Sequence, residues 1–169
     1  MQRIIGVNTW VWTSPLTDES LAELAPRIAA MGFGAIELPL ENAGDWDAAR
    51  ARELLDDLSL APVVVGAMGP GRSLVDRAGN VPATQEYLRT CMAAALTVGA
   101  SVVAGPFYAP TGVTWRMTDE ERAEVSAQLR RNLRPLVDEA LAAGLTLAVE
   151  PLNRYETSVI NTVEQGLDA

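Results

Sequence analysis

Five short apolar runs alternate with helical segments along the chain, and this order constrains the fold more than any other feature. The runs are Ile4–Thr9, Ala35–Leu40, Val63–Met68, Ser101–Phe107 and Leu145–Glu150. Each is continuous and rich in Val, Ile, Leu or Ala, which is typical of parallel strands buried on both faces. The order of strands and helices therefore predicts right-handed crossovers and a single parallel sheet.

The segments between these runs carry apolar residues at helical spacing and have recognisable starts. The first expected helix follows Thr17 and contains Pro26, which predicts a kink. The fourth opens with a capping box, Thr118-x-x-Glu121. The expected apolar faces are Leu21, Leu24, Ile28 and Met31; Ala49, Leu54, Leu55 and Leu58; Leu88, Cys91, Met92, Ala95 and Leu96; and Val125, Leu129, Leu133, Leu136 and Ala140.

This alternation predicts a (β/α)₈ barrel, of which residues 1–169 form a single domain and supply about the first five βα units. A complete barrel takes about 250 residues. A second capping box, Thr162-x-x-Gln165, begins a helix that has only about two turns before Ala169. We therefore expect the N-terminal part of a longer protein; a complete open sheet of five strands is the alternative.

Composition excludes several kinds of chemistry and partner. The net charge is −9, all 13 basic residues are Arg, and there is no Lys or His. Lysine Schiff bases, Ser-His-Asp triads and His-ligated zinc therefore cannot form within this stretch, and the acidic balance argues against nucleic acid as a partner. No run approaches the roughly 20 apolar residues of a membrane span. A single cysteine, Cys91, and the absence of a signal-peptide pattern predict a cytoplasmic protein.

Candidate catalytic residues follow from the rule that active sites of such barrels lie at the carboxyl ends of the strands. Glu150 ends an apolar strand, where a carboxylate is costly unless it is paired, bound to a metal or solvated. The alternative is an acid that only caps the next loop. Glu156 lies on the same loop and could accept hydrogen bonds from substrate hydroxyls, or it could pair with Arg154.

Other polar and aromatic residues near the strand ends have less decided roles. Glu37 and Glu41 flank the end of the second strand; Glu37 faces the barrel mouth or pairs with an arginine, and we favour a structural pairing. Four aromatic residues could wall a sugar-sized pocket, although packing is their commoner role. These are Trp10, Trp12, Phe107 and Tyr108.

Three further features receive a plainer interpretation. Residues 69–72, Gly-Pro-Gly-Arg, predict a turn and not a phosphate loop, because the Walker spacing and its Lys are missing. Gly105 ends the fourth strand, where glycine would let a ligand approach the backbone closely. Cys91 lies on the apolar face of the third helix and is expected in the core.

A resemblance rests on residues 150–157, Glu-Pro-Leu-Asn-Arg-Tyr-Glu-Thr, followed by Ile-Asn-Thr at 160–162. This block resembles the xylose-isomerase-like TIM barrel superfamily of sugar phosphate isomerases and epimerases, and within it the ketose 3-epimerases that act on tagatose, psicose and ribulose. Residues 6–15, 32–37 and 105–108 support it. The resemblance covers the whole chain but only the first five units of the family's barrel.

The resemblance implies specific roles. Glu150 is similar to the family's first metal ligand, which is also one of two glutamate acid/bases, and Glu156 to the acid that binds the sugar's terminal hydroxyls. Asn8 and Gly105 fall where relatives line the substrate pocket. The remaining metal ligands of the family, an Asp, a His and a second Glu, come from strands six to eight. This stretch expressed alone is therefore expected to be inactive.

The implied activity is that of a metal-dependent ketose 3-epimerase that uses Mn²⁺, Co²⁺ or Mg²⁺ and passes through an enediolate. The implied partners are a small ketose or related polyol and further copies of the protein in a homo-oligomer. Thr111 stands where some members have a large aromatic residue, for which Trp115 could substitute. Alternatives are an inosose dehydratase, a hydroxypyruvate-isomerase-like enzyme, or a non-catalytic truncated half-barrel.

Overall fold

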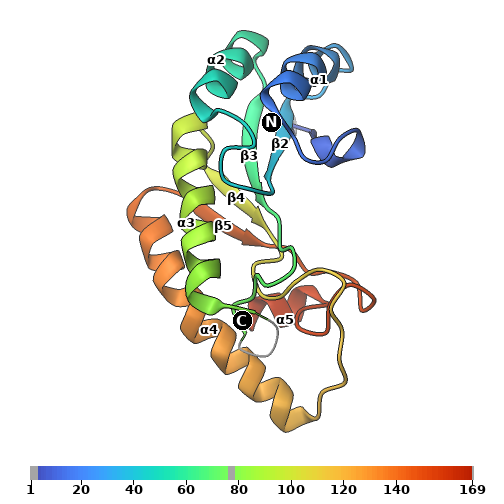
Figure 1. Ribbon diagram of the computed structural model, residues 1–169, viewed down its shortest axis with the longest axis vertical. Coiled ribbons are helices and arrows are strands. Elements are labelled where there is room, and N and C mark those ends of the chain that lie inside the picture. Colours follow the sequence, from blue (N-terminus) through green and yellow to red (C-terminus); the bar gives the residue numbers. More distant parts are fainter. Residues whose placement is uncertain (1–3, 76–78, 169) are drawn as a thin grey trace.

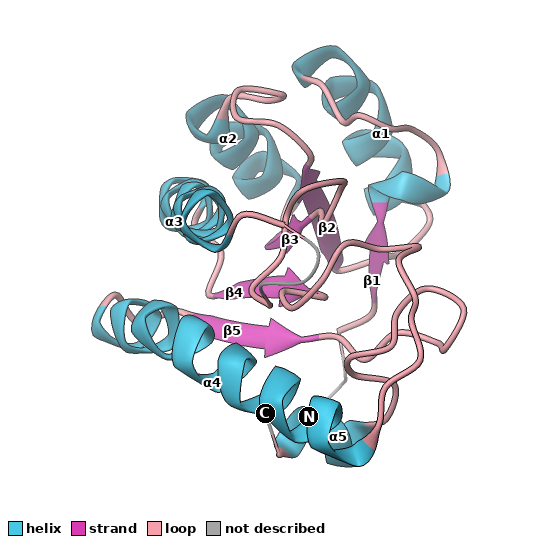
Figure 2. Ribbon diagram, turned by 60° about the horizontal axis from the view of Figure 1, so that its bottom comes forward, coloured by secondary structure: helices cyan, strands magenta, loops and turns pink. Residues whose placement is uncertain are grey.

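The computed structural model describes residues 4–75 and 79–168, and it forms one parallel sheet in the order β1-β2-β3-β4-β5 (Figure 1). The sheet curves into an arc whose convex side is covered by α1 to α4 (Figure 2). The strands are β1 Gly6–Asn8, β2 Ala35–Leu40, β3 Ala61–Gly66, β4 Val102–Gly105 and β5 Thr146–Val149. The helices are the 3₁₀ turn η1 Thr9–Val11, α1 Asp18–Ala30, α2 Ala48–Leu58, α3 Val81–Val98, α4 Asp119–Ala142 and α5 Val163–Leu167. The predicted order of five parallel units is confirmed.

Several strand boundaries differ from the prediction, and a side chain bonds to the backbone just past the ends of β1 and β3. β1 stops at Asn8, whose side-chain oxygen accepts the N–H of Trp10 at 2.9 Å and begins η1. β3 begins and ends two residues earlier than expected. At Ala67 the backbone N–H donates to the hydroxyl of Tyr87 at 2.6 Å, so this donor turns toward α3. β4 and β5 are each shorter than predicted.

The helix starts follow the capping rules that the sequence displays. The predicted box at Thr118 and Glu121 is present at the start of α4. Thr162 caps α5 by accepting the N–H of Gln165, but the Gln165 side chain accepts the N–H of Asn161 at 2.7 Å, so the reciprocal half of the expected box is missing. α1 continues through Pro26 to Ala30. Within residues 4–75 and 79–168, no helix combines the length and apolar character needed to cross a bilayer.

The core lies between the convex face of the sheet and the helices. Ile36, Leu38, Val64 and Val103 are fully buried there. Cys91 is buried as predicted, and burial raises the pKa of its thiol to about 11. The core also contains most of the predicted helix faces, including Leu21, Leu24 and Ile28 of α1 and Leu129, Leu133, Leu136 and Ala140 of α4.

Three residues predicted for these buried faces are exposed: Ala49 in the first turn of α2, Leu96 and Met31. Leu96 is 48% exposed, because it follows the buried Ala95 and the helix turns about 100° per residue. Met31 is 56% exposed, because it stands at the C-cap of α1, beyond the last helical turn that packs on the sheet. The errors at Leu96 and Met31 arise at the margin of an apolar stripe.

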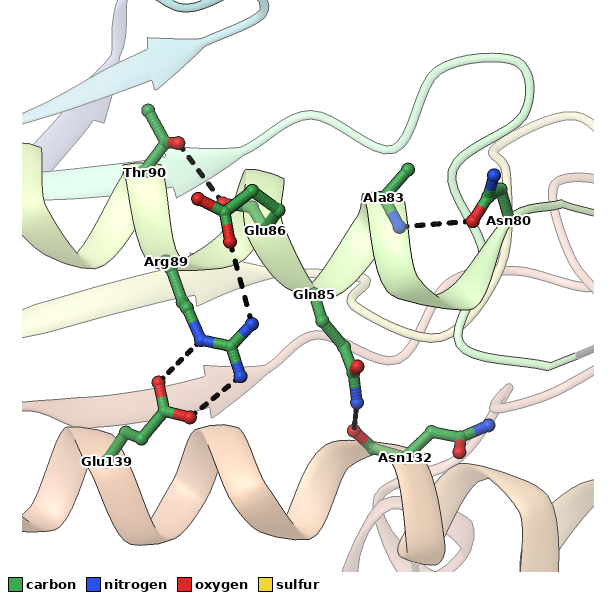
Figure 3. A network of polar contacts seen from close by, with 8 residues as sticks. All are labelled: Asn80, Ala83, Gln85, Glu86, Arg89, Thr90, Asn132 and Glu139. Atoms are coloured by element: carbon green, nitrogen blue, oxygen red, sulfur yellow. Dashed lines mark hydrogen bonds and ion pairs between the residues drawn. The ribbon is translucent and has the colours of Figure 1, made fainter.

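Polar contacts hold α4 against α3 on the outside of the arc (Figure 3). Arg89 donates to both carboxylate oxygens of Glu139, each at 2.8 Å. Gln85 donates to the backbone oxygen of Asn132 at 2.8 Å, and the Asn132 side chain donates to the backbone oxygen of Leu74 at 2.8 Å. The Arg89–Glu139 pair is solvent-exposed, so it contributes little to stability.

Candidate functional site

Glu150 lies on the concave face of the sheet. Leu147 is paired in register with Val103, which is fully buried under the helices, so Leu147 and Val149 belong to the convex face. Side chains of a strand alternate between faces. The backbone N–H of Glu150 donates to Gly105 O at 3.0 Å and extends the ladder by one residue, which places the Glu150 side chain inside the arc.

Two other carboxylates act on Glu150. The pKa of its carboxyl is raised, first by loss of hydration around the group and then by the negative charges of Glu37 and Glu156. All three causes destabilise the charged form of an acid. The sequence singled out Glu150 and Glu156 together, but we favoured a structural role for Glu37. Its position between the apolar residues Ile36 and Leu38 is the sequence feature that could have assigned Glu37 to the face of the sheet opposite to theirs.

The register of β1 and β2 places a side-chain amide beside Glu37. Asn8 of β1 is paired with Glu37 of β2, and Asn8 Nδ2 donates to Glu37 Oε2 at 2.9 Å. The other side-chain atom of Asn8 caps η1 through Trp10. Among the residues that the structure describes, the side chain of Glu37 therefore pairs with an amide and with no arginine. Asn8 orients this carboxylate, and its predicted place in a substrate pocket stays a prediction.

Glu156 is held by its own loop. Its side-chain oxygen Oε2 accepts a short hydrogen bond from Asn153 Nδ2, and its backbone N–H donates to Asn153 O at 3.0 Å. Arg154, the alternative partner, is exposed and stacks near the Tyr155 ring at 5.2 Å instead. Among residues 4–75 and 79–168, Glu156 is therefore held by Asn153 and pairs with no arginine.

An open cavity of about 460 Å³ lies beside Glu156. Its lining comes from the loops after β1, β2, β3, β4 and β5, the end of the sheet where barrel active sites form. Among the described residues that line it there is no arginine; they are Trp10, Ser14, Glu41, Ala67, Met68, Gly69, Thr111 and Glu156. Trp115 packs against the core cluster, whereas Thr111 lines the cavity.

The four aromatic candidates divide into two groups. Trp10 lines the cavity, and Trp10 and Trp12 are 40% and 36% exposed. Phe107 and Tyr108 are each 1% exposed and belong to the core, so they pack as the plainer interpretation expected.

Tyr108 also has a polar role that the sequence did not indicate. Its hydroxyl donates to Glu150 O at 2.8 Å and accepts the N–H of Leu152 at 3.1 Å. Burial raises the pKa of Tyr108, so the hydroxyl keeps its proton. The residue therefore fixes the path by which the chain leaves β5 beside Glu150.

Gly105 is required by the packing of neighbouring strands. Its φ is +145°, and a Cβ there would lie 2.7 Å from the backbone oxygen of Gly66 and 3.1 Å from the Phe107 ring. Gly105 is buried and does not line the cavity, so contact with a substrate stays a prediction. The predicted turn after β3 is confirmed, since Arg72 N donates to Gly69 O at 3.2 Å.

The donor set fits a divalent cation in part. Glu150 offers carboxylate oxygens, the ligand type that Mg²⁺ and Mn²⁺ prefer, and a cation would offset the repulsion that raises its pKa. Across residues 4–75 and 79–168, no group of three or more His, Cys, Asp or Glu side chains could hold a metal. Glu150 would therefore be one ligand of a set that the described residues do not complete.

Comparison with known proteins now identifies the family. The family model for xylose isomerase-like TIM barrels matches residues 25–169. The chain belongs to this family. The L-ribulose 3-epimerase of Mesorhizobium japonicum is 28% identical over 166 residues, covering 96% of this chain and 54% of that protein. The ketose 3-epimerase of Arthrobacter globiformis is 24% identical over 164 residues, covering 96% and 56%.

Solved structures agree with the family assignment. An L-ribulose 3-epimerase structure matches with a TM-score of 0.80 at 27% identity, over 98% of this chain and 55% of that chain. The D-allulose 3-epimerase of Methylomonas sp. in complex with D-allulose has the same fold, with a TM-score of 0.79 at 24% identity over 99% and 58%. The chain therefore spans about half the length of the relatives it matches, and its sheet forms five βα units of a (β/α)₈ barrel.

Proposed function

We propose that the protein is a metal-dependent ketose 3-epimerase in which Glu150 is the catalytic base and a metal ligand. The observation that carries this proposal is the position of Glu150 at the carboxyl end of β5, on the concave face, with Glu37 and Glu156 acting on its carboxyl. Relatives named as an L-ribulose 3-epimerase and a ketose 3-epimerase match 96% of the chain over about half of their own length, which supports the same chemistry.

The charges around the site favour an uncharged polyhydroxy substrate. Glu41 and Glu156 line the cavity, and none of the described lining residues is basic. Carboxylates accept hydrogen bonds from sugar hydroxyls, whereas a phosphate group would be repelled by them. The indole of Trp10 gives the same cavity an apolar wall against which the C–H groups of a sugar can pack.

In the proposed reaction Glu150 removes the proton from C3 of the ketose, and the substrate becomes an enediolate. Its raised pKa suits this step, because a base whose pKa is closer to neutral binds the proton more readily. Glu150 would hold a divalent ion, and that ion, when bound, would polarise the carbonyl next to C3. Glu156 would accept hydrogen bonds from substrate hydroxyls and hold the open-chain sugar in place. Return of a proton to the opposite face then inverts C3.

Deuterium exchange tests the proposal directly. Full-length protein is stripped with EDTA, loaded with Mn²⁺, Co²⁺ or Mg²⁺, and incubated in D₂O with L-ribulose, D-allulose or D-tagatose. We expect NMR to show deuterium at C3 together with the C3 epimer, and no reaction after EDTA alone. Dehydration of an inosose or isomerisation of hydroxypyruvate, without exchange at C3 of any ketose, would contradict it.

A further inference from the structure

Glu41 is a carboxylate held in place through its side chain. It lies directly after β2, and its Oε1 accepts hydrogen bonds from Trp10 Nε1 at 2.9 Å and from Ser14 Oγ at 2.6 Å. Both donors come from the segment after β1, about thirty residues earlier in the chain, and all three residues line the cavity. Two neutral donors orient the carboxylate and leave its charge in place.

The backbone of Glu41 is held as well. Arg72 Nη2 donates to Glu41 O at 2.6 Å, and Arg72 Nη1 donates to Ala67 O at 2.7 Å. The guanidinium of Arg72 stacks on the Tyr87 ring at 3.7 Å, and the Tyr87 hydroxyl donates to Leu40 O at 2.6 Å. The loops after β2 and β3 are thus clamped together over α3. A binding group that is already fixed in position loses little freedom when a ligand arrives.

The position of Glu41 decides which part of a ligand it can meet. The cavity extends from Glu41 to Glu156, and Glu150 is not among its lining residues. A ligand whose reacting carbon lies at Glu150 therefore presents a more distant part of its chain to Glu41.

We propose that Glu41 is a specificity-determining residue, which accepts a hydrogen bond from a sugar hydroxyl distant from the reacting carbon while Trp10 packs on the neighbouring C–H groups. This inference rests on the proposed epimerase function, and it names the substrate feature that the enzyme selects. Ser14 and Trp10 hold the carboxylate of Glu41 in position. The proposed bond to the sugar hydroxyl therefore depends on the charge of Glu41 and on the hydrogen bond that Trp10 donates to it.

Kinetics on a matched substrate series test this role in the full-length protein. The series is a ketohexose and its analogues that each lack one hydroxyl at C5 or C6. We expect Glu41→Gln to reduce kcat/KM for the parent ketose roughly 10- to 100-fold, mainly through KM, which corresponds to one hydrogen bond to a charged group. For the analogue that lacks the recognised hydroxyl, the same variant should change kcat/KM less than about twofold. Bound metal should be unchanged.

Two controls separate recognition from folding. Glu139→Gln removes an acid on α4 far from the cavity and should leave the whole series unchanged. Trp10→Phe keeps an aromatic ring but removes the donor to Glu41, so it should reproduce part of the Glu41→Gln effect. Thermal melting of each variant shows whether it folds.

A binding measurement makes failure of this inference distinguishable from failure of the proposed function. Tryptophan fluorescence should change when the parent ketose is added to metal-loaded protein, because Trp10 lines the cavity, and Trp10→Phe should remove most of that change. If no ketose is turned over but Glu41→Gln still weakens this binding, the epimerase function is wrong and the role of Glu41 stands. If turnover occurs and Glu41→Gln affects all substrates equally or none, the role of Glu41 is overturned.

Discussion

Acidic residues on the helices and acidic residues at the strand ends have different partners. On the helices, Glu139, Asp138 and Glu23 each pair with an arginine, at 2.8, 2.9 and 3.3 Å. At the strand ends the partners are neutral side chains. Asn8 binds Glu37, Trp10 and Ser14 bind Glu41, and Asn153 binds Glu156.

The two kinds of partner have different consequences for the charge of the acid. An exposed ion pair neutralises both members and contributes little to stability. An amide, an indole or a hydroxyl orients a carboxylate without neutralising it, and the charges of Glu37 and Glu156 add to the burial that raises the pKa of Glu150. For Glu150 this repulsion is a cost to the fold, and perturbed acids of this kind are typical of functional sites.

Replacing Glu150, the acid on which Glu37 and Glu156 act, should have the largest effect on activity. Glu150→Gln keeps the shape but cannot accept the C3 proton, so we expect kcat to fall by about 10²- to 10⁴-fold in the full-length protein. Metal uptake, measured by isothermal titration, should also weaken. The matched control is Glu139→Gln, an arginine-paired acid on α4. If Glu150→Gln were as active as the unsubstituted protein, the contrast between acids at the strand ends and arginine-paired acids on the helices would have no functional meaning.

Glu156 should affect substrate binding and leave the metal in place. Glu156→Ala removes an acceptor from the cavity, and we expect kcat/KM for a ketose to fall roughly 10- to 100-fold. Metal content, measured by atomic emission, should stay within error of the parent protein. Loss of the bound metal would instead make Glu156 a metal ligand.

Tyr108 tests how firmly the exit from β5 is fixed. Tyr108→Phe keeps the ring in the core but leaves the oxygen of Glu150 without this donor, and the N–H of Leu152 keeps only its bond to Ile160 O at 3.1 Å. We expect the free energy of unfolding to fall by about 1–3 kcal/mol in urea titrations. Phe107→Leu, beside it in the core, is the control for packing alone. An unchanged midpoint would show that the hydroxyl does not hold this loop.

The smallest effect concerns the pH dependence of stability, and its sign should differ between the two regions. The raised pKa of Glu150 means that the folded state prefers the protonated acid, so the resulting stability is present at low pH and is lost as the pH rises through the folded pKa. In EDTA, Glu150→Gln should therefore melt slightly higher than the parent at pH 7, with no difference below about pH 4.

Glu139 should behave in the opposite way. Arg89 donates to it and holds its pKa below the usual value, so its stabilisation is present at neutral pH and is lost as the pH falls through the folded pKa. Glu139→Gln should melt slightly lower than the parent at pH 7 and match it in acid. Differential scanning calorimetry at several pH values measures both variants. Shifts of the same sign would contradict the contrast between the two regions.

Local sequence was sufficient for most of the fold. Apolar runs and helical spacing occur within short windows, so the five strands, the capping box at Thr118 and the burial of Cys91 could be predicted without any long-range contact. The same reasoning located Glu150, because an acid at the end of an apolar strand is costly wherever the strand lies. The errors at Leu96 and Met31 occurred where a helical stripe ends and the neighbouring element decides burial.

The arrangement of the site was decided only by the tertiary structure. Asn8 meets Glu37 because two strands pair in one particular register, and Trp10 meets Glu41 because two loops cross at the same end of the sheet. The Tyr108 hydroxyl reaches the exit of β5 across more than forty residues of chain. A sequence specifies its periodicity residue by residue, whereas these contacts depend on strand register and loop paths, which are set only when all five units pack together.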